Sequence, residues 1–457
     1  MTSKLEKLKN STLFYYSLTD MPLTMSIFPA LVFIPRFYST DVGVPLAAVG
    51  AYIFAARMID VFTDPLMGFI SDRTRSRWGR RRPWVVIASP ILMLGLYLLF
   101  MPPEGASGIY MFACMVLLGI GTTMMLIPYY AWGAELSDDY NERTRITGWR
   151  AGSGVVGQLT VQLVPAVALA VWGIGGTEAV LEMVGITILI ILPIAVFFTI
   201  WKTPEPQVEV NLVVSPWEGL VAMAKNGPFK LLVVSFMISQ IGLNITTPLY
   251  LFFVADVLGA EEQTIYMLSI FYVTNLLSIP FWVWFGSKIG KHKAYICSFV
   301  LIACAHPLYL LLGPGDFWWM APITILTGFS AGGFSQALPN SMKADVIDLD
   351  TASTGENRAA LFFSAWSFAY KATASLGAAI AMFGLSLWGF DASPGAVNGE
   401  EELFGLRFLF STFPSVFFLT AAAIVWRYPI TEERHAEIRE EIEAQRMVFD
   451  SGSQRAR

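Results

Sequence analysis

The sequence predicts an all-α membrane protein with twelve transmembrane helices. Apolar stretches of about 20 residues recur from one end of the chain to the other, and this length crosses a bilayer as a helix. Only 14% of the 457 residues are charged, whereas soluble domains carry about 25%. Such stretches are too long for barrel strands, and only helices or closed barrels satisfy the backbone in lipid. The expected spans are about 12–37, 46–71, 84–101, 108–134, 146–173, 180–201, 229–255, 264–286, 294–312, 317–339, 359–389 and 404–427.

The loops show a charge asymmetry that predicts the orientation of the chain. Three alternate connections, 102–108, 173–178 and 257–263, contain no Lys or Arg. The connections between them are basic, beginning with the arginine-rich stretch 73–82. Because basic loops stay in the cytoplasm, both termini are expected there, which requires an even number of spans. We expect a multi-pass protein of the cell inner (cytoplasmic) membrane, whose first apolar segment is a membrane helix and not a signal peptide.

The longest inner connection divides the chain into two halves of similar size. A basic, glycine-containing loop follows the second span of each half, at 68–82 and 286–293. This correspondence indicates a parallel repeat of six helices. The predicted domains are an N-terminal six-helix bundle (1–205), a cytoplasmic linker with a short surface helix (206–228), a C-terminal six-helix bundle (229–428) and a cytoplasmic tail (429–457).

Ionisable residues inside the spans are candidates for function, because each costs at least ~2.5–3.5 kcal/mol to insert. Asp60 and Asp64 lie one turn apart on one helix face, and Arg57 precedes Asp60 by three residues. Two carboxylates so close repel each other in a low dielectric, and a bound cation or a shared proton relieves that repulsion. The alternative is a closed salt-bridge network with Arg57 and Lys371 that binds no ion. The whole set is Asp20, Arg57, Asp60, Asp64, Arg150 and Lys371.

Asp20 and Arg150 can reach a central cavity and hydrogen-bond hydroxyls or an anionic group. For Arg150, near the start of its span, snorkelling to the cytoplasmic surface is the alternative. Gly152, Gly154 and Gly157 in the same span predict close contact with a neighbouring helix. Aromatic residues near the charges could stack on a sugar ring or simply pack between helices. They are Tyr15, Tyr16, Tyr129, Tyr130, Trp149 and Trp366.

The sequence offers no catalytic or metal-binding motif. It contains no HExxH, no Cys/His cluster with metal spacing and no phosphate-binding loop. The three histidines are scattered, and the three cysteines lie inside apolar stretches. The net charge of −5 gives no reason to expect a nucleic-acid partner. We therefore expect neither an enzyme nor a resident cofactor.

One stretch of the chain resembles the signature of a known family. Asp60-Val-Phe-Thr-Asp64-Pro65-Leu-Met-Gly68 runs into the arginine-rich segment from Asp72 to Trp84. This resembles the glycoside–pentoside–hexuronide:cation symporters of the major facilitator superfamily. Supporting matches occur along the rest of the chain, among them Ile127-Pro128-Tyr129, Glu135, Glu142-Arg143-Thr144, Thr354-Gly355-Glu356 and Lys371.

The resemblance implies the major facilitator fold, with two six-helix bundles around a central cavity that works by alternating access. It implies that Asp60 and Asp64 bind the coupling ion, Na⁺ or H⁺, with help from Thr123. It also implies that Asp20, Tyr130 and Arg150 contact the solute, and that Lys371 lies near the cation. Trp149 and Trp366 complete the candidate set for substrate binding.

We therefore expect a secondary symporter that moves a sugar, glycoside or uronide with Na⁺ or H⁺. Leu126 replaces an aspartate that serves both sites elsewhere in the family, which weakens the case for sodium and favours protons. The rival functions are a lysolipid or other amphiphile symporter on the same fold, and a non-transporting membrane scaffold. The expected partners are a small-molecule solute and membrane lipid, and the protein is expected to be a monomer. The arginine loop would close a cytoplasmic gate formed by Asp72, Arg73, Arg80, Glu135 and Arg143.

Overall fold

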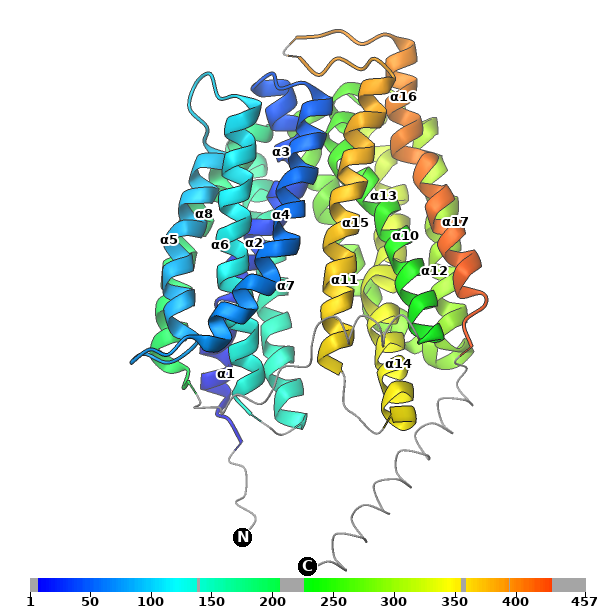
Figure 1. Cartoon of the computed structure of the whole chain (residues 1–457). Helices are drawn as coiled ribbons and strands as arrows, with labels where there is room; N and C mark the ends of the chain where they lie inside the picture. Colours follow the sequence, from blue (N-terminus) through cyan, green and yellow to red (C-terminus); the bar gives the residue numbers. More distant parts are fainter. Residues whose placement is uncertain (1–6, 138–139, 206–225, 355–358, 394, 430–457) are drawn as a thin grey trace, which may run out of the picture. The chain divides into compact units, whose positions relative to one another are not determined.

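The structure is a computed structural model that describes residues 7–137, 140–205, 226–354, 359–393 and 395–429. Its regular elements in these ranges are all helices (Figure 1). The predicted surface helix of the linker and the charged tail lie outside the described residues. The division into four domains therefore stays a prediction.

Many of the helices are long and apolar enough to cross a membrane. Within the described residues ten helices meet that standard, and an eleventh is added if the bent pair Asn10–Val32 and Ile34–Asp41 is one span. The predicted span 317–339 is not among them. It consists of the 3-10 segment η5 (Phe317–Trp319), the 12-residue helix α13 (Met320–Ala331) and the π segment η6 (Gly332–Ala337). The membrane fold is thus supported, and the count of twelve remains a prediction.

The described residues form two compact units. Unit 1 lies within 1–211, 247–269 and 378–406, and unit 2 within 212–246, 270–377 and 407–457. Unit 1 therefore includes a stretch of each of four α-helices from the second half of the chain. Its complete elements are α1 (Asn10–Ser17), α2 (Asp20–Val32), α3 (Ile34–Arg36), η1 (Phe37–Asp41), α4 (Leu46–Arg73), α5 (Arg82–Phe100), α6 (Gly108–Glu135), α7 (Tyr140–Trp172), α8 (Thr177–Lys202), η2 (Phe253–Val257) and η3 (Glu261–Gln263).

Glycines let the helices of unit 1 approach closely. A Cβ on Gly121 of α6 would lie 2.8 Å from the Cα of Leu92 in α5, so these two backbones touch. In α7, a Cβ on Gly157 would lie 2.3 Å from the carbonyl oxygen of Met21 in α2. The predicted close contact is confirmed for Gly157 and for its neighbour Gly154, described below. It is wrong for Gly152, which has open space around it.

The first span and the seventh end in the same irregular way. The α-helix gives way to a π segment, η1 at Phe37–Asp41 and η2 at Phe253–Val257. A glycine with positive φ follows each, Gly43 at 82° and Gly259 at 66°. The backbone hydrogen bonds also correspond, because Val44 N donates to Tyr38 O just as Ala260 N donates to Val254 O. The two halves of the chain therefore share a detail of backbone geometry.

Unit 2 packs around an aromatic core. Phe299 of α12 and Phe418 of α17 are fully buried, and both contact the ring of Phe334. Lys291 at the start of α12 binds Asp345 of α14, with Nζ 2.7 Å from Oδ1. The remaining elements are α10 (Gly227–Phe252), α11 (Thr264–Ile289), α12 (Lys291–Ala305), η4 (His306–Leu311), α14 (Leu338–Thr354), α15 (Ala359–Leu387), α16 (Glu400–Ser411) and α17 (Phe413–Val425); α10, α11, α15 and α16 each cross between the units.

Candidate functional site

The two acids of α4 face α6 at neighbouring turns. Thr123 Oγ1 donates a hydrogen bond of 2.7 Å to Asp64 Oδ1. One turn earlier, Asp60 lies against Gly119, where a Cβ would come within 2.7 Å of Asp60 Oδ1. Because Gly119 and Thr123 are also four residues apart, the two helices run side by side in register. The predicted cation-site residues Asp60, Asp64 and Thr123 thus lie on one helix pair.

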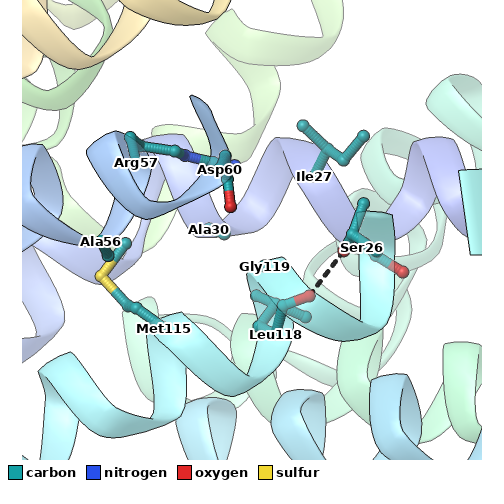
Figure 2. A pocket seen from close by; sticks show the side chains of 10 residues that line it. Ser26, Ile27, Ala30, Ala56, Arg57, Asp60, Met115, Leu118 and Gly119 are labelled. Carbon is teal, nitrogen blue, oxygen red and sulfur yellow. Dashed lines mark hydrogen bonds and ion pairs between the residues drawn. The ribbon is translucent and has the colours of Figure 1, made fainter. Parts of the chain in front are cut away.

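Asp60 is the more buried of the two acids. Its carboxylate is 5% exposed, and Arg57 Nη1 lies 3.2 Å from Oδ2. Figure 2 shows Asp60 beside a small cavity between α2, α4 and α6. The other residues around this cavity are Ser26, Ile27, Ala30, Ala56, Arg57, Met115, Leu118, Gly119 and Thr122.

Each acid therefore has its own partner inside unit 1. Asp64 is partly exposed, and its carboxylate does not line the cavity around Asp60. Lys371 belongs to unit 2, so the closed salt-bridge network with Arg57 remains an untested alternative. Among the described residues no three His, Cys, Asp or Glu side chains are placed to hold a metal ion together. An ion at this site would need oxygen ligands from Thr123 or the backbone as well.

A second charged cluster joins α2, α6 and α7. The guanidinium of Arg150 lies over the ring of Tyr130, 3.8 Å from its centre, and Arg150 Nε is 3.9 Å from Asp20 Oδ1. Asp20 is 6% exposed, and its Oδ1 accepts no hydrogen bond. A Cβ on Gly154 would lie 2.8 Å from Asp20 Oδ2, so only glycine leaves room for this carboxylate. Arg150 thus turns toward Asp20, and its contact with a solute stays a prediction.

Two tyrosines hold this cluster in place. Tyr16 OH donates to Tyr129 O at 2.9 Å, and Tyr129 OH donates to Tyr16 O at 2.8 Å. Their rings are stacked with centres 4.7 Å apart, and both residues are fully buried. For Tyr16 and Tyr129 the packing interpretation is therefore confirmed. Their role in the structure is to fix α1 against α6 next to Tyr130.

The two tryptophans of the candidate set have different surroundings. Trp149 is 38% exposed and packs edge-on against Phe14 at 6.4 Å. Trp366 belongs to unit 2, where it is 8% exposed and packs at a tilt against the ring of Phe236, with ring centres 4.1 Å apart. The aromatic core of unit 2 thus accounts for the position of Trp366, and solute contact by either tryptophan stays a prediction.

The arginine loop folds back on the end of α6. Arg81 is buried at its centre, with Nη2 2.6 Å from Glu135 Oε1 and further hydrogen bonds to Ser71 and Asp72. Burial by itself lowers the pKa of the Arg81 guanidinium, but Glu135 and Asp72 raise it above its usual value. Arg81 therefore stays cationic and ties the ends of α4 and α6 together.

Residues beside Arg81 extend this cluster. Arg80 Nη2 also binds Glu135, at 2.5 Å, and Arg82 Nη2 donates to the carbonyl of Thr203 at 2.6 Å. The Glu205 carboxylate accepts from the backbone N–H groups of Arg81 and Arg82. The sequence indicated Asp72, Arg80 and Glu135, but the spacing gave no signal for Glu205.

Of the other two predicted gate residues, the structure describes the side chain of Arg73 alone, and it contacts Phe69. The guanidinium of Arg73 lies 3.6 Å from the ring centre of Phe69, one turn back on α4. The side chain of Arg143 lies outside what the structure describes. The contacts of the arginine cluster all lie inside unit 1, so its action as a gate stays a prediction.

An ion pair that the sequence did not predict lies at the opposite end of the spans from the arginine loop. Arg36 is 4% exposed, with Nη1 2.6 Å from Asp256 Oδ2 and Nη2 3.5 Å from Glu261 Oε1. It also lies over the ring of Phe252 at 5.1 Å. The segments that follow, Phe37-Tyr-Ser-Thr-Asp and Phe253-Val-Ala-Asp-Val, share only the phenylalanine, so the sequence offers no clear signal for this pair.

The comparison with protein families decides what kind of protein this is. The sequence matches the family described as MFS/sugar transport protein over residues 15–432. The chain belongs to this family. The resemblance drawn from residues 60–84 and the predicted major facilitator fold are thereby confirmed. Members of the family are transporters and not enzymes, as the sequence analysis expects.

Individual relatives are similar over nearly the whole chain. The chain is 25% identical to the glucuronide carrier protein homolog of Escherichia coli K12, with 97% of each chain covered. It is 24% identical to the sodium-dependent lysophosphatidylcholine symporter 1-B of Danio rerio, with 91% of this chain and 86% of the relative covered. Among solved structures it is similar to the nucleoside transporter NupG, with a TM-score of 0.63, 16% identity, and 92% and 100% coverage. At that identity the likeness to NupG supports the fold alone.

Proposed function

We propose that this family member is a secondary active transporter that moves a sugar, glycoside or hexuronide by symport with Na⁺ or H⁺. The observation that carries the proposal is that two charged clusters share the helix α6. On α6, Thr123 contacts the cation-site acid Asp64, and Tyr130, about 10 Å further along the axis, contacts Arg150. A movement of α6 would therefore be felt by both clusters, and symport requires such coupling.

The chemistry of each cluster suits its role. Asp60, Asp64 and Thr123 offer oxygen ligands for Na⁺, and either carboxylate could instead take up a proton. In the second cluster, Asp20 Oδ1 accepts no hydrogen bond within the protein and could accept one from a solute hydroxyl, and Arg150 is a donor for hydroxyls or a carboxylate. The ring of Tyr130, with Trp149 and Trp366, would pack against the apolar face of a sugar. The name of the Escherichia coli relative, a glucuronide carrier homolog, supports a hexuronide or glycoside.

The surroundings of the transporter follow from the loop charges. We infer a cell inner membrane location, with both termini in the cytoplasm. The arginine cluster around Arg81 would then lie on the cytoplasmic side, where Arg80, Asp72 and Glu135 could stabilise one state of the gate. The pair of Arg36 with Asp256 would lie on the outer side. We propose that the protein works as a monomer in lipid.

Uptake into proteoliposomes tests the proposal. We expect the wild-type protein to accumulate methyl β-D-glucuronide or methyl β-D-xyloside against a gradient of Na⁺ or H⁺. Asp64→Asn should lose accumulation but retain counterflow, because the solute cluster is intact while the cation site has lost a charge. Asp316→Asn, in a loop of unit 2, is the matched control and should behave like the wild type. Normal accumulation by Asp64→Asn would refute the cation site, and absence of counterflow of any solute in the wild type would support the scaffold alternative.

A lysolipid or other amphiphile symporter is the second candidate. The similarity to the Danio rerio lysophosphatidylcholine symporter supports it, as does Leu126 in place of an acid. Competition separates the two functions. If lysophosphatidylcholine below its micellar concentration blocks counterflow of the glycoside and is itself transported, the amphiphile is the substrate. If it does neither, the glycoside proposal stands.

A further inference from the structure

One buried polar side chain in unit 1 has no role in the two clusters above. Gln162 of α7 is 0% exposed, and neither its Oε1 nor its Nε2 makes a hydrogen bond. One turn earlier, Nε2 of Gln158 is also buried without a hydrogen-bond partner. A buried amide without partners is costly, so such a group in a native structure requires an explanation.

Gln158 and Gln162 continue a row that starts at the solute cluster. Arg150, Gly154, Gln158 and Gln162 follow one another at intervals of four residues, so each lies about one turn further along α7 and about 40° further around it. With a rise of 1.5 Å per residue, Gln162 lies about 18 Å along the axis from Arg150. The orientation inferred above puts Gln162 on the outer side of the solute cluster. The row therefore extends from the solute cluster toward the outer end of α7.

The first turns of α11 contact the backbone at this end of the row. Ser269 Oγ lies 3.5 Å from the backbone oxygen of Gln162, and it also hydrogen-bonds to Ile265 O within α11. Residues 264–269 of α11 belong to unit 1, although the rest of that helix belongs to unit 2. Gln162 is thus contacted by one end of a helix whose other part belongs to unit 2. A rotation of α11 would uncover the glutamine.

The chemistry of the amide points to the kind of ligand. Leucine has nearly the same volume as glutamine and would fill an apolar site without leaving unpaired polar atoms. An amide presents one acceptor and two donors with no net charge. A sugar hydroxyl both donates and accepts, so it can satisfy both ends of the amide. The same amide would gain nothing from an acyl chain.

We propose that Gln158 and Gln162 form a hydroxyl-binding site for the solute on the outer side of Asp20 and Arg150. The start of α11 covers this site in the present state and uncovers it when the transporter loads from outside. This inference rests on the proposed function, since it names where that same solute binds first. It assigns the two glutamines to solute specificity and gives the start of α11 the role of a cover.

The accessibility of an introduced cysteine to a thiol reagent tests this binding site without reference to any solute. In a background free of cysteine, the thiol introduced by Gln162→Cys should react with a membrane-impermeant methanethiosulfonate applied from outside. Val161→Cys is the matched control, because Val161 is 1% exposed and points to another side of the helix, and it should stay unreactive. No reaction at Gln162→Cys, or equal reaction at both positions, would overturn the proposal whatever the wild type transports.

Transport kinetics test the hydroxyl contact. The probes are methyl β-D-glucuronide and its 2-, 3- and 4-deoxy analogues. For the wild-type protein, the KM of one analogue should differ at least tenfold from the KM of the parent glucuronide. Gln162→Leu should abolish that difference. The thermal midpoint of Gln162→Leu should stay unchanged or rise, because an unpaired buried amide has been removed. A KM within twofold of wild type for all four probes would refute the contact. If the wild type transports none of the probes, the proposed substrate class fails, and the labelling experiment alone decides the path.

Discussion

Replacing Gly119 with alanine tests whether Asp60 must approach α6 closely. The new Cβ would lie 2.7 Å from Asp60 Oδ1, about 0.7 Å short of the 3.4 Å at which ordinary contact begins. The carboxylate would have to turn, although Arg57 holds its other oxygen at 3.2 Å. A hydrogen bond to a charged group contributes about 1.5–3 kcal/mol, and about 1.4 kcal/mol is tenfold in affinity. We therefore expect the cation concentration for half-maximal uptake to rise about tenfold or more.

The assay is the initial rate of solute uptake into proteoliposomes. It is measured against NaCl at fixed ionic strength and separately against external pH, with the thermal midpoint of the purified protein alongside. Gly152→Ala is the matched control, since a Cβ there meets no atom within 4 Å. If Gly119→Ala and Gly152→Ala have the same cation concentration for half-maximal uptake and the same thermal midpoint, the close approach of Asp60 to α6 has no part in ion binding.

Three further substitutions examine other parts of unit 1. Arg81→Gln removes the buried cation between two acids, and the free energy of unfolding should fall by about 3–5 kcal/mol, measured by chemical or thermal denaturation. Asp256→Asn leaves Arg36 buried with one remaining carboxylate, that of Glu261, at 3.5 Å. The free energy of unfolding should therefore fall by about 1.5–3 kcal/mol. Tyr130→Leu removes the ring beneath Arg150, a contact of about 0.5–2 kcal/mol, so the KM for the solute should rise several-fold while cation half-saturation stays constant.

Each of these predictions has a matched control. Arg75→Gln changes an exposed arginine of the same loop, and Glu104→Gln an exposed acid of another loop, so neither should change the denaturation midpoint. Tyr130→Phe keeps the ring and should keep most of the solute affinity. Equal midpoints for Arg81→Gln and Arg75→Gln, or equal KM values for Tyr130→Leu and Tyr130→Phe, would show that the corresponding contacts contribute nothing.

The sequence predicted the fold because its signals are local. Lipid demands long apolar helices, and ionisable residues inside them are few enough to single out Asp60, Asp64, Asp20 and Arg150. The side of a helix on which a residue lies was harder to predict. Gly152 shares a span with Gly154 and Gly157, yet it lies on another side of the helix and meets nothing.

Partners that lie far apart in the chain could not be predicted from spacing. Arg36 and Asp256 are separated by 220 positions, and neither is unusual at the end of an apolar span. The same holds for Arg81 and Glu205, which lie 124 positions apart. Such pairs depend on which helix ends meet in space, and hydrophobic periodicity carries no information on that choice.

The matching π segments bear on how this chain arose. A π segment is an α-helix with one additional residue in a turn. In the first span it begins at Phe37 and the positive-φ glycine is Gly43; in the seventh it begins at Phe253 and the glycine is Gly259. The interval is the same in both, so the additional residue occupies equivalent positions. Such agreement is expected if the residue was inserted before an ancestral gene of half the length was duplicated. Each copy then kept the π turn while its neighbours diverged, and one copy came to supply the arginine and the other the aspartate of a single ion pair.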